Sequence, residues 1–488
     1  MFKYLFAFVI FLLPFSSSAA PMPRETVFDV PALISTPLDA KVLTSTEKEG
    51  IVTEEVMFHS EMDGAKSVDI FAFFSYPKGA QNLPAFIWNQ AGMGQANTYF
   101  TELGAKRGYA ALCIDLPLSG YRSTGGYSMP SSPDLKDIQV NSDPKQTSIY
   151  HCAVALLKAV SFLESRTEVD KTRIGMAGSS WGGFITTLMI GFDPRLKVGS
   201  AMFGDGAMQE GNVWWDGNGQ SAKRDAAYRA KWKTTLDPAW RLQFSKTPIA
   251  WFSGTNDNFY WMPSLMKSYE MADGPKHLSL FPNWDHGLPP IGDEQVFVWL
   301  DTYLKGAPPF LQVAPIKLKK RGGELFAQWK FSGARQAQSA NLILSYGEAG
   351  NWQRRAWITL PAQIVGDVAE AKLPPSQLPI YISGTIFDTN GFRTSTPLLE
   401  VSPSEFGKAK AEMIEYDGAA MWGGFEPEQM QFLDGLGWPH PPASKQARTG
   451  AQSAELSATK TVLPPLNFTA GVPHRFTAFL KSDTPVTV

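Results

Sequence analysis

The chain has 488 residues, enough for two or three domains and a large buried core. Its 44 Lys and Arg residues nearly balance its 46 Asp and Glu residues, for a formal net charge of -2. This balance does not favour nucleic acid or an anionic membrane as a partner, so we expect a neutral or small-molecule substrate.

The N-terminal residues have the pattern of a secretory signal peptide. Lys3 precedes an almost wholly apolar run from Leu5 to Phe15, and small residues follow at positions 16–20. The run is shorter than the roughly 20 apolar residues of a membrane span. We therefore expect residues 1–19 to be cleaved near Ala19 and the mature, soluble protein to be exported to the periplasm or beyond. An uncleaved membrane anchor is the alternative.

Residues 20–308 have the pattern of an α/β domain. Predicted strands lie at 51–61, 67–76, 84–89, 109–115, 173–177, 198–203, 248–253 and 277–281, and predicted helices at 98–107, 148–163, 182–190, 263–271 and 293–303. Such alternation predicts a mostly parallel sheet flanked by helices, with the functional site at the carboxyl ends of the strands. The long connection 206–246 has helical character and is a candidate lid.

A second domain is predicted after the linker Lys305–Pro309. Residues 309–404 contain short strand candidates at the spacing of a β-sandwich, near 316–318, 324–329, 341–346, 357–360, 368–373 and 379–387. We expect this domain to pack against the first, and glycan binding is the less favoured alternative. For residues 405–488 the sequence indicates a strand at 475–480 and no overall fold.

The sequence Gly178-Ser-Ser-Trp-Gly182 fits the G-x-S-x-G nucleophile elbow. An elbow holds its serine in a strained turn between a strand and a helix, and it needs small residues two places before and after. Gly178 and Gly182 meet that need when Ser180 is the nucleophile. Centring the motif on Ser179 instead would place Ala177 and Trp181 at those positions, so Ser180 is the predicted nucleophile.

A serine nucleophile needs a base and an acid that orients the base. Asp257 follows the predicted strand 248–253, and His286 lies in the loop after the strand 277–281. The resulting chain order of Ser, Asp and His is that of hydrolases with this elbow. Asp205, after an earlier strand, is the alternative acid. Asp285 is poorly directed to orient the ring of its own neighbour.

An oxyanion formed by attack of Ser180 needs two N–H donors. The residue after the nucleophile, Trp181, is predicted to supply one from its backbone. The turn that follows the strand 84–89 is predicted to supply the other, and the choice between Gln90 and Ala91 stays open. The turn's glycines also fit an ordinary tight turn.

Aromatic residues gather in the loops around the predicted site. They are Trp181, Trp214, Trp215, Phe259, Tyr260, Trp261 and Trp284. Such side chains could stack on a sugar ring or an apolar acyl group, or equally could pack a lid and a core. The two cysteines, Cys113 and Cys152, are expected to be buried thiols, with a disulfide between them as the alternative.

Together the elbow, the segment Gly254-Thr-Asn-Asp257 and the loop of His286 resemble the α/β-hydrolase superfamily over residues 50–305. The resemblance is nearest to secreted acetyl xylan esterase and dienelactone hydrolase-like proteins, and more distant to prolyl oligopeptidase-type serine hydrolases. It implies an exported serine esterase that needs no metal or organic cofactor and acts on a small or carbohydrate ester. A peptidase and a non-catalytic binding protein remain the alternatives, and the oligomeric state is open.

Overall fold

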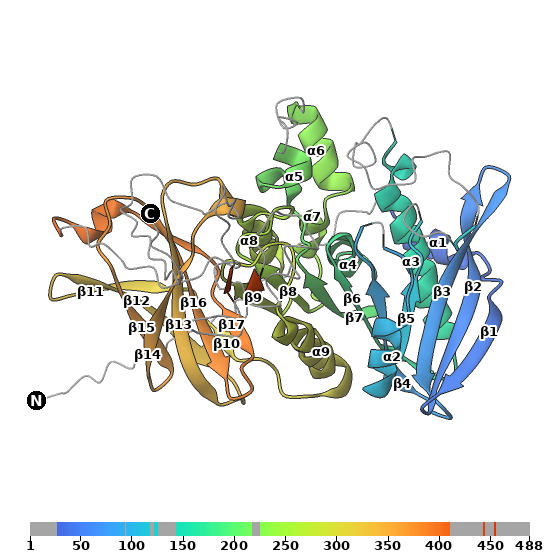
Figure 1. Cartoon of the computed structure of the whole chain (residues 1–488). Helices are drawn as coiled ribbons and strands as arrows, with labels where there is room; N and C mark the ends of the chain where they lie inside the picture. The colour runs from blue at the N-terminus through green and yellow to red at the C-terminus, as the bar shows by residue number, and fades with distance from the viewer. Residues whose placement is uncertain are drawn as a thin grey trace, which may run out of the picture.

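A computed structural model describes residues 27–92, 94–117, 122–124, 143–216 and 225–409, and the backbone of two short strands at 443–444 and 453–454. Two domains follow one another along the chain (Figure 1). An α/β domain comes first, and an antiparallel β-domain packs at one end of its sheet. The predicted signal peptide and almost all of the segment 410–488 lie outside the described residues.

The strands of the α/β domain are β1 (Lys41–Lys48), β2 (Ile51–Asp63), β3 (Lys66–Pro77), β4 (Leu83–Asn89), β5 (Ala110–Ile114), β6 (Val169–Ser179), β7 (Leu196–Met202), β8 (Ile249–Gly254) and β9 (Lys276–Phe281). The helices are α1 (Val30–Ser35), α2 (Tyr99–Lys106), α3 (Ser148–Ser165), α4 (Trp181–Ile190), α5 (Val213–Asp216), α6 (Ala226–Thr235), α7 (Pro238–Leu242), α8 (Met262–Met271) and α9 (Pro290–Lys305). Short 3-10 turns lie at Pro144–Gln146 and Met208–Glu210.

The large sheet has the strand order β1-β2-β3-β5-β4-β6-β7-β8-β9. Strands β1 to β3 pair antiparallel, β3 pairs antiparallel with β5, and every later neighbour pair is parallel. The predicted α/β fold with a mostly parallel sheet is thus confirmed. Because β6 lies in the middle of the parallel part, its carboxyl end is flanked by the ends of β4 and β7.

Residues of the central strands alternate between two cores because successive side chains of a strand point to opposite faces. On β3, Ile70, Ala72 and Phe74 face a core shared with α3, α4 and α8, while Phe71 and Phe73 face a core shared with α2 and α9. Helices therefore cover both faces of the sheet. Within the described residues, no helix is both long enough and apolar enough to cross a bilayer.

The β-domain is an antiparallel sheet that curls around its own apolar core. Its strands are β10 (Gln312–Val313), β11 (Lys317–Arg321), β12 (Glu324–Ser332), β13 (Ala337–Tyr346), β14 (Ile358–Val365), β15 (Val368–Leu373), β16 (Ile380–Asp388), β17 (Arg393–Ser395) and β18 (Leu399–Val401), with 3-10 turns at Trp352–Arg354 and Pro403–Phe406. The main order is β10-β12-β15-β14-β13-β16-β17, with β11 beside β12 and β18 beside β16. The predicted sandwich-like domain is thus present.

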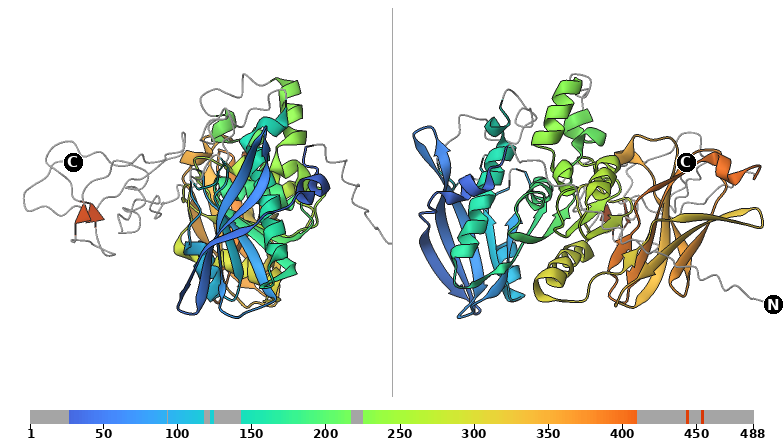
Figure 2. Two further views of the ribbon diagram at one scale, coloured as in Figure 1. Left: turned by 90° about the vertical axis from the view of Figure 1, so that its right-hand side faces the viewer. Right: turned by 180° about the vertical axis from the view of Figure 1, so that it is seen from behind.

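The β-domain covers the last strand of the α/β sheet. Leu280 of β9 donates its N–H to Ser395 Oγ of β17 at 3.1 Å, and Gln295 of α9 accepts the N–H of Arg393 at 2.7 Å. Trp352, Trp357 and other β-domain residues join one core of the α/β domain. An exposed edge strand is open to pairing with other chains, and this contact closes the β9 edge. Viewed from behind in Figure 2, the blue strands β1 to β3 lie at the opposite end.

Candidate active site

Ser180 stands alone between β6 and α4, in the strained turn expected of an elbow. Its φ of 55° and ψ of -118° lie in a region that residues other than glycine rarely adopt. Such conformations cost about 1–3 kcal/mol and persist when surrounding contacts hold them. Here Ser180 donates its N–H to Met202 O at 2.9 Å, and its own carbonyl accepts the N–H of Phe184 at 2.9 Å.

Three glycines leave room for this turn. A Cβ on Gly178 would lie 2.6 Å from the carbonyl of Gly182, and one on Gly182 would lie 2.2 Å from Asn89 O. A Cβ on Gly204, after β7, would lie 2.1 Å from Ser180 O. The spacing of the elbow motif therefore has a direct physical cause, because the backbones of β4, β7 and α4 meet around Ser180.

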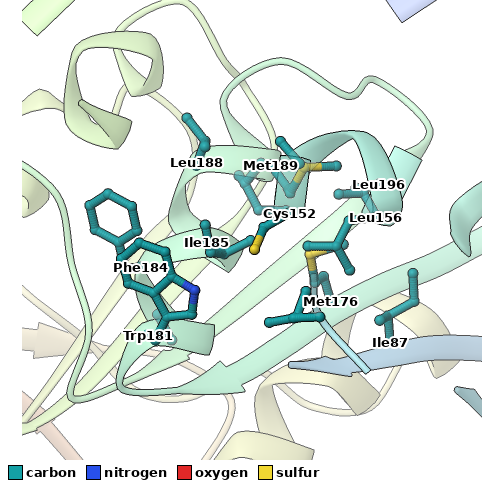
Figure 3. Packing of buried hydrophobic residues seen from close by; sticks show 14 of the residues in the cluster. Ile87, Cys152, Leu156, Met176, Trp181, Phe184, Ile185, Leu188, Met189 and Leu196 are labelled. Atoms are coloured by element: carbon teal, nitrogen blue, oxygen red, sulfur yellow. The ribbon is translucent and has the colours of Figure 1, made fainter. Parts of the chain in front are cut away.

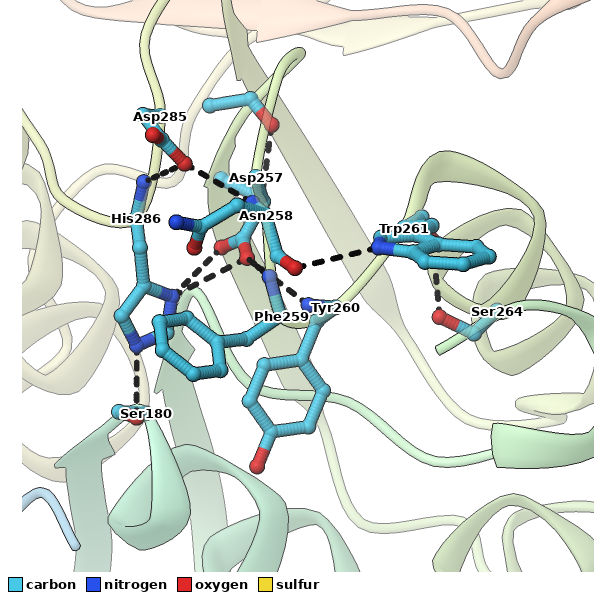
Figure 4. Close-up of polar contacts among 11 residues, drawn as sticks. Ser180, Asp257, Asn258, Phe259, Tyr260, Trp261, Ser264, Asp285 and His286 are labelled. Carbon is cyan, nitrogen blue, oxygen red and sulfur yellow. Dashed lines mark hydrogen bonds and ion pairs between the residues drawn. The ribbon is translucent and has the colours of Figure 1, made fainter. Parts of the chain in front are cut away.

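The structure brings the three residues predicted to act together into one hydrogen-bonded line (Figure 4). His286 Nε2 lies 2.7 Å from Ser180 Oγ, and His286 Nδ1 lies 2.9 Å and 3.1 Å from the two carboxylate oxygens of Asp257. The three side chains come from the ends of β6, β8 and β9, which is the edge of a parallel sheet where sites form.

Backbone donors compensate for the burial of the Asp257 carboxylate. The side chain of Asp257 is 1% exposed, and its Oδ1 accepts the N–H groups of Phe259 and Tyr260, both at 2.8 Å. A buried carboxylate is tolerated when such donors and a partner surround it. The turn after β8 thus fixes both the position and the orientation of the group that faces His286.

A profile of the alpha/beta hydrolase family matches residues 83–327, which is half of the chain and includes Ser180, Asp257 and His286. The chain belongs to this family. No curated protein matches it. Similar solved structures include an acetyl xylan esterase from Paenibacillus sp. R4, with 22% identity and a TM-score of 0.48 over 56% of this chain and 92% of that one.

Two further similar structures are esterases. Acetyl xylan esterase 1 from Thermoanaerobacterium sp. JW/SL YS485 has 16% identity and a TM-score of 0.47, over 56% of this chain and 92% of that one. A glucuronoyl esterase from Solibacter usitatus has 12% identity and a TM-score of 0.39, over 56% and 91% of the two chains.

In this α/β hydrolase, Asp285 joins the loops that carry Asp257 and His286. Its Oδ1 accepts the N–H of Asn258 and the N–H of His286, both at 2.8 Å. Asp285 thus holds the backbone next to the imidazole, while Asp257 contacts the ring. Burial, with a smaller contribution from the nearby charge of Asp257, raises the pKa of Asp285 to about 6.

This raised pKa predicts the sign of a pH effect on stability. The folded state holds the proton of Asp285 more tightly than the unfolded chain does, where the pKa is about 3.9. The free energy of unfolding therefore falls as the pH rises from about 4 through 6. Asn at this position keeps an oxygen that accepts both N–H groups and carries no charge. Asp285→Asn should therefore raise the free energy of unfolding at pH 8 by up to about 3 kcal/mol.

Chemical denaturation of both proteins at pH 4 and pH 8 checks this prediction. The difference between Asp285→Asn and the unchanged protein should vanish near pH 4. Asp367→Asn, at a side chain that is 68% exposed, is the matched control and should leave stability unchanged at both pH values. A variant at position 285 that is less stable than the unchanged protein at pH 8 would contradict the prediction.

Aromatic rings surround the imidazole of His286. The ring of Phe259 lies 4.6 Å from it, that of Phe203 lies 4.8 Å away and that of Tyr260 lies 6.1 Å away, stacked at 20°. No sequence motif singles out Phe203, although it directly follows β7. Its φ of 35° turns the chain at this point, and no sequence motif signals that turn.

Two predicted site tryptophans serve the core instead. Trp181 is 3% exposed and stacks on Phe184, and Figure 3 shows both rings among the apolar side chains of α4. Trp215 is fully buried and packs against Trp232. The prediction of Trp215 as a pocket residue is therefore wrong, because a fully buried ring presents no surface to a ligand.

The other aromatic candidates differ in exposure. Tyr260 is 1% exposed, so it too presents almost no surface to a ligand, and burial raises its pKa well above the usual value. Trp261 is partly exposed and donates Nε1–H to Asn258 O at 3.2 Å, and Trp284 is partly exposed in the loop of His286. The side chain of Trp214 lies outside the described residues.

The predicted oxyanion donors lie around the elbow. Trp181 is the first residue of α4, and the first N–H groups of a helix have no partner within it. Gln90 follows β4, and its carbonyl oxygen would lie 2.7 Å from a Cβ on Gly182. Ala91 accepts the N–H of Gly94 at 2.9 Å, closing a turn. The β4–α2 loop thus passes directly beside the elbow.

Asp205, the alternative acid, is not the carboxylate that contacts the imidazole, which is Asp257. Within the described part of the chain, no hydrogen bond joins Asp205 to His286. It is 1% exposed, and burial raises its pKa well above the usual value.

Cys113 and Cys152 are both buried free thiols, which excludes the alternative of a disulfide between them. Over the described residues, no group of three or more His, Cys, Asp and Glu side chains is arranged for a metal ion.

Proposed function

We propose that this α/β hydrolase cleaves carboxylic esters through an acyl-enzyme on Ser180. The observation that carries the proposal is the position of His286, whose two ring nitrogens lie within hydrogen-bond distance of Ser180 Oγ and of the Asp257 carboxylate. A serine hydroxyl is a weak nucleophile until a base can take its proton. The imidazole is placed to do so, and the carboxylate is placed to select its tautomer.

In the first half-reaction, Ser180 Oγ attacks the ester carbonyl carbon while its proton passes to His286 Nε2. Asp257 stabilises the imidazolium that results. The carbonyl oxygen becomes an oxyanion, which the N–H of Trp181 and one N–H of the β4–α2 loop stabilise. The alcohol then leaves with the proton held on Nε2, and the acyl group stays on Ser180.

In the second half-reaction, water attacks the acyl carbon and gives a proton to His286 Nε2. The second oxyanion collapses, the bond to Oγ breaks, and Ser180 takes the proton back as the carboxylic acid departs. The strained turn at Ser180 supports both steps, because it presents Oγ above the end of β6.

We further propose that the substrate is a neutral ester, either an acylated carbohydrate or another small ester. The partly exposed rings of Phe203 and Phe259 beside His286 favour an apolar or stacking contact over an ionic one. We also propose that residues 1–19 direct export, which would bring the enzyme to substrates outside the cytoplasm.

Hydrolysis assays on three substrate classes test the proposed reaction. p-Nitrophenyl acetate, acetylated xylo-oligosaccharides and prolyl arylamides should be offered to the full-length protein beside Ser180→Ala and Ser179→Ala. We expect ester hydrolysis by the unchanged protein and by Ser179→Ala, and loss of hydrolysis in Ser180→Ala. Cleavage of the arylamides with inert esters would favour a peptidase. A folded protein no faster than Ser180→Ala on every substrate would contradict the proposal.

A further inference from the structure

Three loops meet behind the proposed catalytic residues. We call residues 254–258, which carry Asp257, the acid loop, and residues 282–286, which carry His286, the histidine loop. The third is the clamp loop, residues 351–357 of the β-domain, which lies about 70 to 100 positions further along the sequence from the other two. The first two belong to the α/β domain, so the clamp loop is a contribution from a different domain.

Asn283 joins the histidine loop to the clamp loop through both the nitrogen and the oxygen of its side-chain amide. Nδ2 donates to Trp357 O at 2.8 Å, and Oδ1 accepts the N–H of Trp357 at 2.8 Å. Asn283 itself has a φ of 61°, a left-handed conformation that Asn tolerates better than most residues. The pair of bonds fixes both the distance and the angle between the loops three residues before His286.

Asn256 ties the acid loop to the same segment. Its Nδ2 donates to Arg355 O at 2.6 Å, and its backbone N–H donates to Trp284 O at 2.8 Å. The next residue is Asp257. The acid loop and the histidine loop are thus joined to one another and, through one asparagine each, to consecutive parts of the clamp loop.

The clamp loop is itself held firmly. Arg355 is 6% exposed, and its guanidinium donates to Ser345 Oγ and to the carbonyls of Tyr346, Gly347, Glu348 and Gly350 at 2.7 to 3.1 Å. Its Cζ also lies 4.8 Å from the ring centres of both Trp352 and Tyr381. Trp357 is 1% exposed. Because so many hydrogen bonds order the clamp loop, it can fix the positions of the acid loop and the histidine loop that bind to it.

We propose that the β-domain is part of the catalytic apparatus as a positioning element, and that Asn283 and Asn256 transmit the clamp loop's position to His286 and Asp257. The inference rests on the proposed function, because it assigns a role in the alignment of the same three residues. Displacing a catalytic group by about 1 Å can reduce a rate on the order of 100-fold. The two asparagines touch none of the reacting atoms, so they are positioning residues.

The interface between the domains supplies a control that separates positioning from stability. Ser395 Oγ accepts the N–H of Leu280 across the same interface, and this bond does not involve the acid or histidine loop. Ser395→Ala should therefore lower the melting temperature and leave the chemistry of Ser180 unaltered. A role of the clamp loop in packing alone predicts that Asn283 and Ser395 variants behave alike.

The experiment measures the rate at which a fluorophosphonate labels Ser180 in the full chain, together with kcat and KM on p-nitrophenyl acetate. The variants are Asn283→Gly, which permits the left-handed φ but removes both bonds, Asn283→Asp, which keeps the acceptor for Trp357 N–H, and Asn256→Ala. Each is assayed well below its melting temperature, beside Ser395→Ala. We expect labelling and kcat to fall by about 10- to 100-fold in Asn283→Gly, less in Asn283→Asp, with KM nearly unchanged.

Two results would overturn the inference while leaving the proposed function standing. One is labelling of Asn283→Gly and Asn256→Ala at the rate of the unchanged protein. The other is an equal fall in labelling in Ser395→Ala, which would attribute the effect to stability. If the unchanged protein itself is not labelled at Ser180, the proposed function fails first, so the two failures are distinguishable.

Discussion

Asp257→Asn is expected to lower kcat/KM for ester hydrolysis by on the order of 10³- to 10⁴-fold, with little change in stability. The amide is nearly the same size as the carboxylate, so the loop can keep its shape. Its Oδ1 can still accept the N–H groups of Phe259 and Tyr260. The loss follows because an amide cannot stabilise the imidazolium of His286 and can favour the wrong tautomer of the ring.

Asp205→Asn is the matched control, since both acids are buried and both follow a strand of the parallel sheet. Burial raises the pKa of Asp205 well above its usual value, and a neutral amide avoids the cost of burying a charge at this position, so the replacement is mild. We expect activity within a few-fold of the unchanged protein. Steady-state kinetics at pH 7.5 on p-nitrophenyl acetate decide the matter, and a large loss at position 205 with little at 257 would identify Asp205 as the acid.

Most of the fold could be predicted from the sequence because the central strands carry uninterrupted apolar runs and the helices carry apolar residues at helical spacing. The strand β1 was not predicted. All eight of its residues are exposed, so Lys41–Lys48 shows neither alternation nor an apolar run. The short strands β17 and β18 were missed for a related reason, since they are only three residues long and their place is set by contacts with β9 and β16.

The candidate site could be predicted to the extent that its chemistry requires particular side chains in a particular chain order. Ser180, Asp257 and His286 meet that condition, and the structure brings them together. The clamp loop does not meet that condition, because it contacts the acid loop and the histidine loop mainly through the backbone of Arg355 and Trp357. Backbone atoms leave no signature in sequence. Trp215 was misassigned because position after a strand does not tell which way a ring points.

Gly182→Ala is expected to destabilise the protein by about 3 kcal/mol or more, although alanine is the better helix former by about 1 kcal/mol. The added Cβ would lie 2.2 Å from Asn89 O and 2.7 Å from Gln90 O. Both are backbone atoms at the end of β4, which is paired on both sides in the middle of the sheet, so they cannot move aside as a flexible side chain would.

The comparison with Gly79→Ala separates this clash from the ordinary cost of replacing a glycine. Gly79 has a φ of 72° and open space around it, so alanine there should cost only about 1 kcal/mol of backbone strain. Urea denaturation of both variants measures the difference. Because the displaced segment also contains the proposed oxyanion donors, Gly182→Ala should lose activity even where it stays folded, whereas Gly79→Ala should keep it. Equal stability of the two variants would contradict the close approach of β4 to the elbow, and with it the reason why this motif requires glycine at that position.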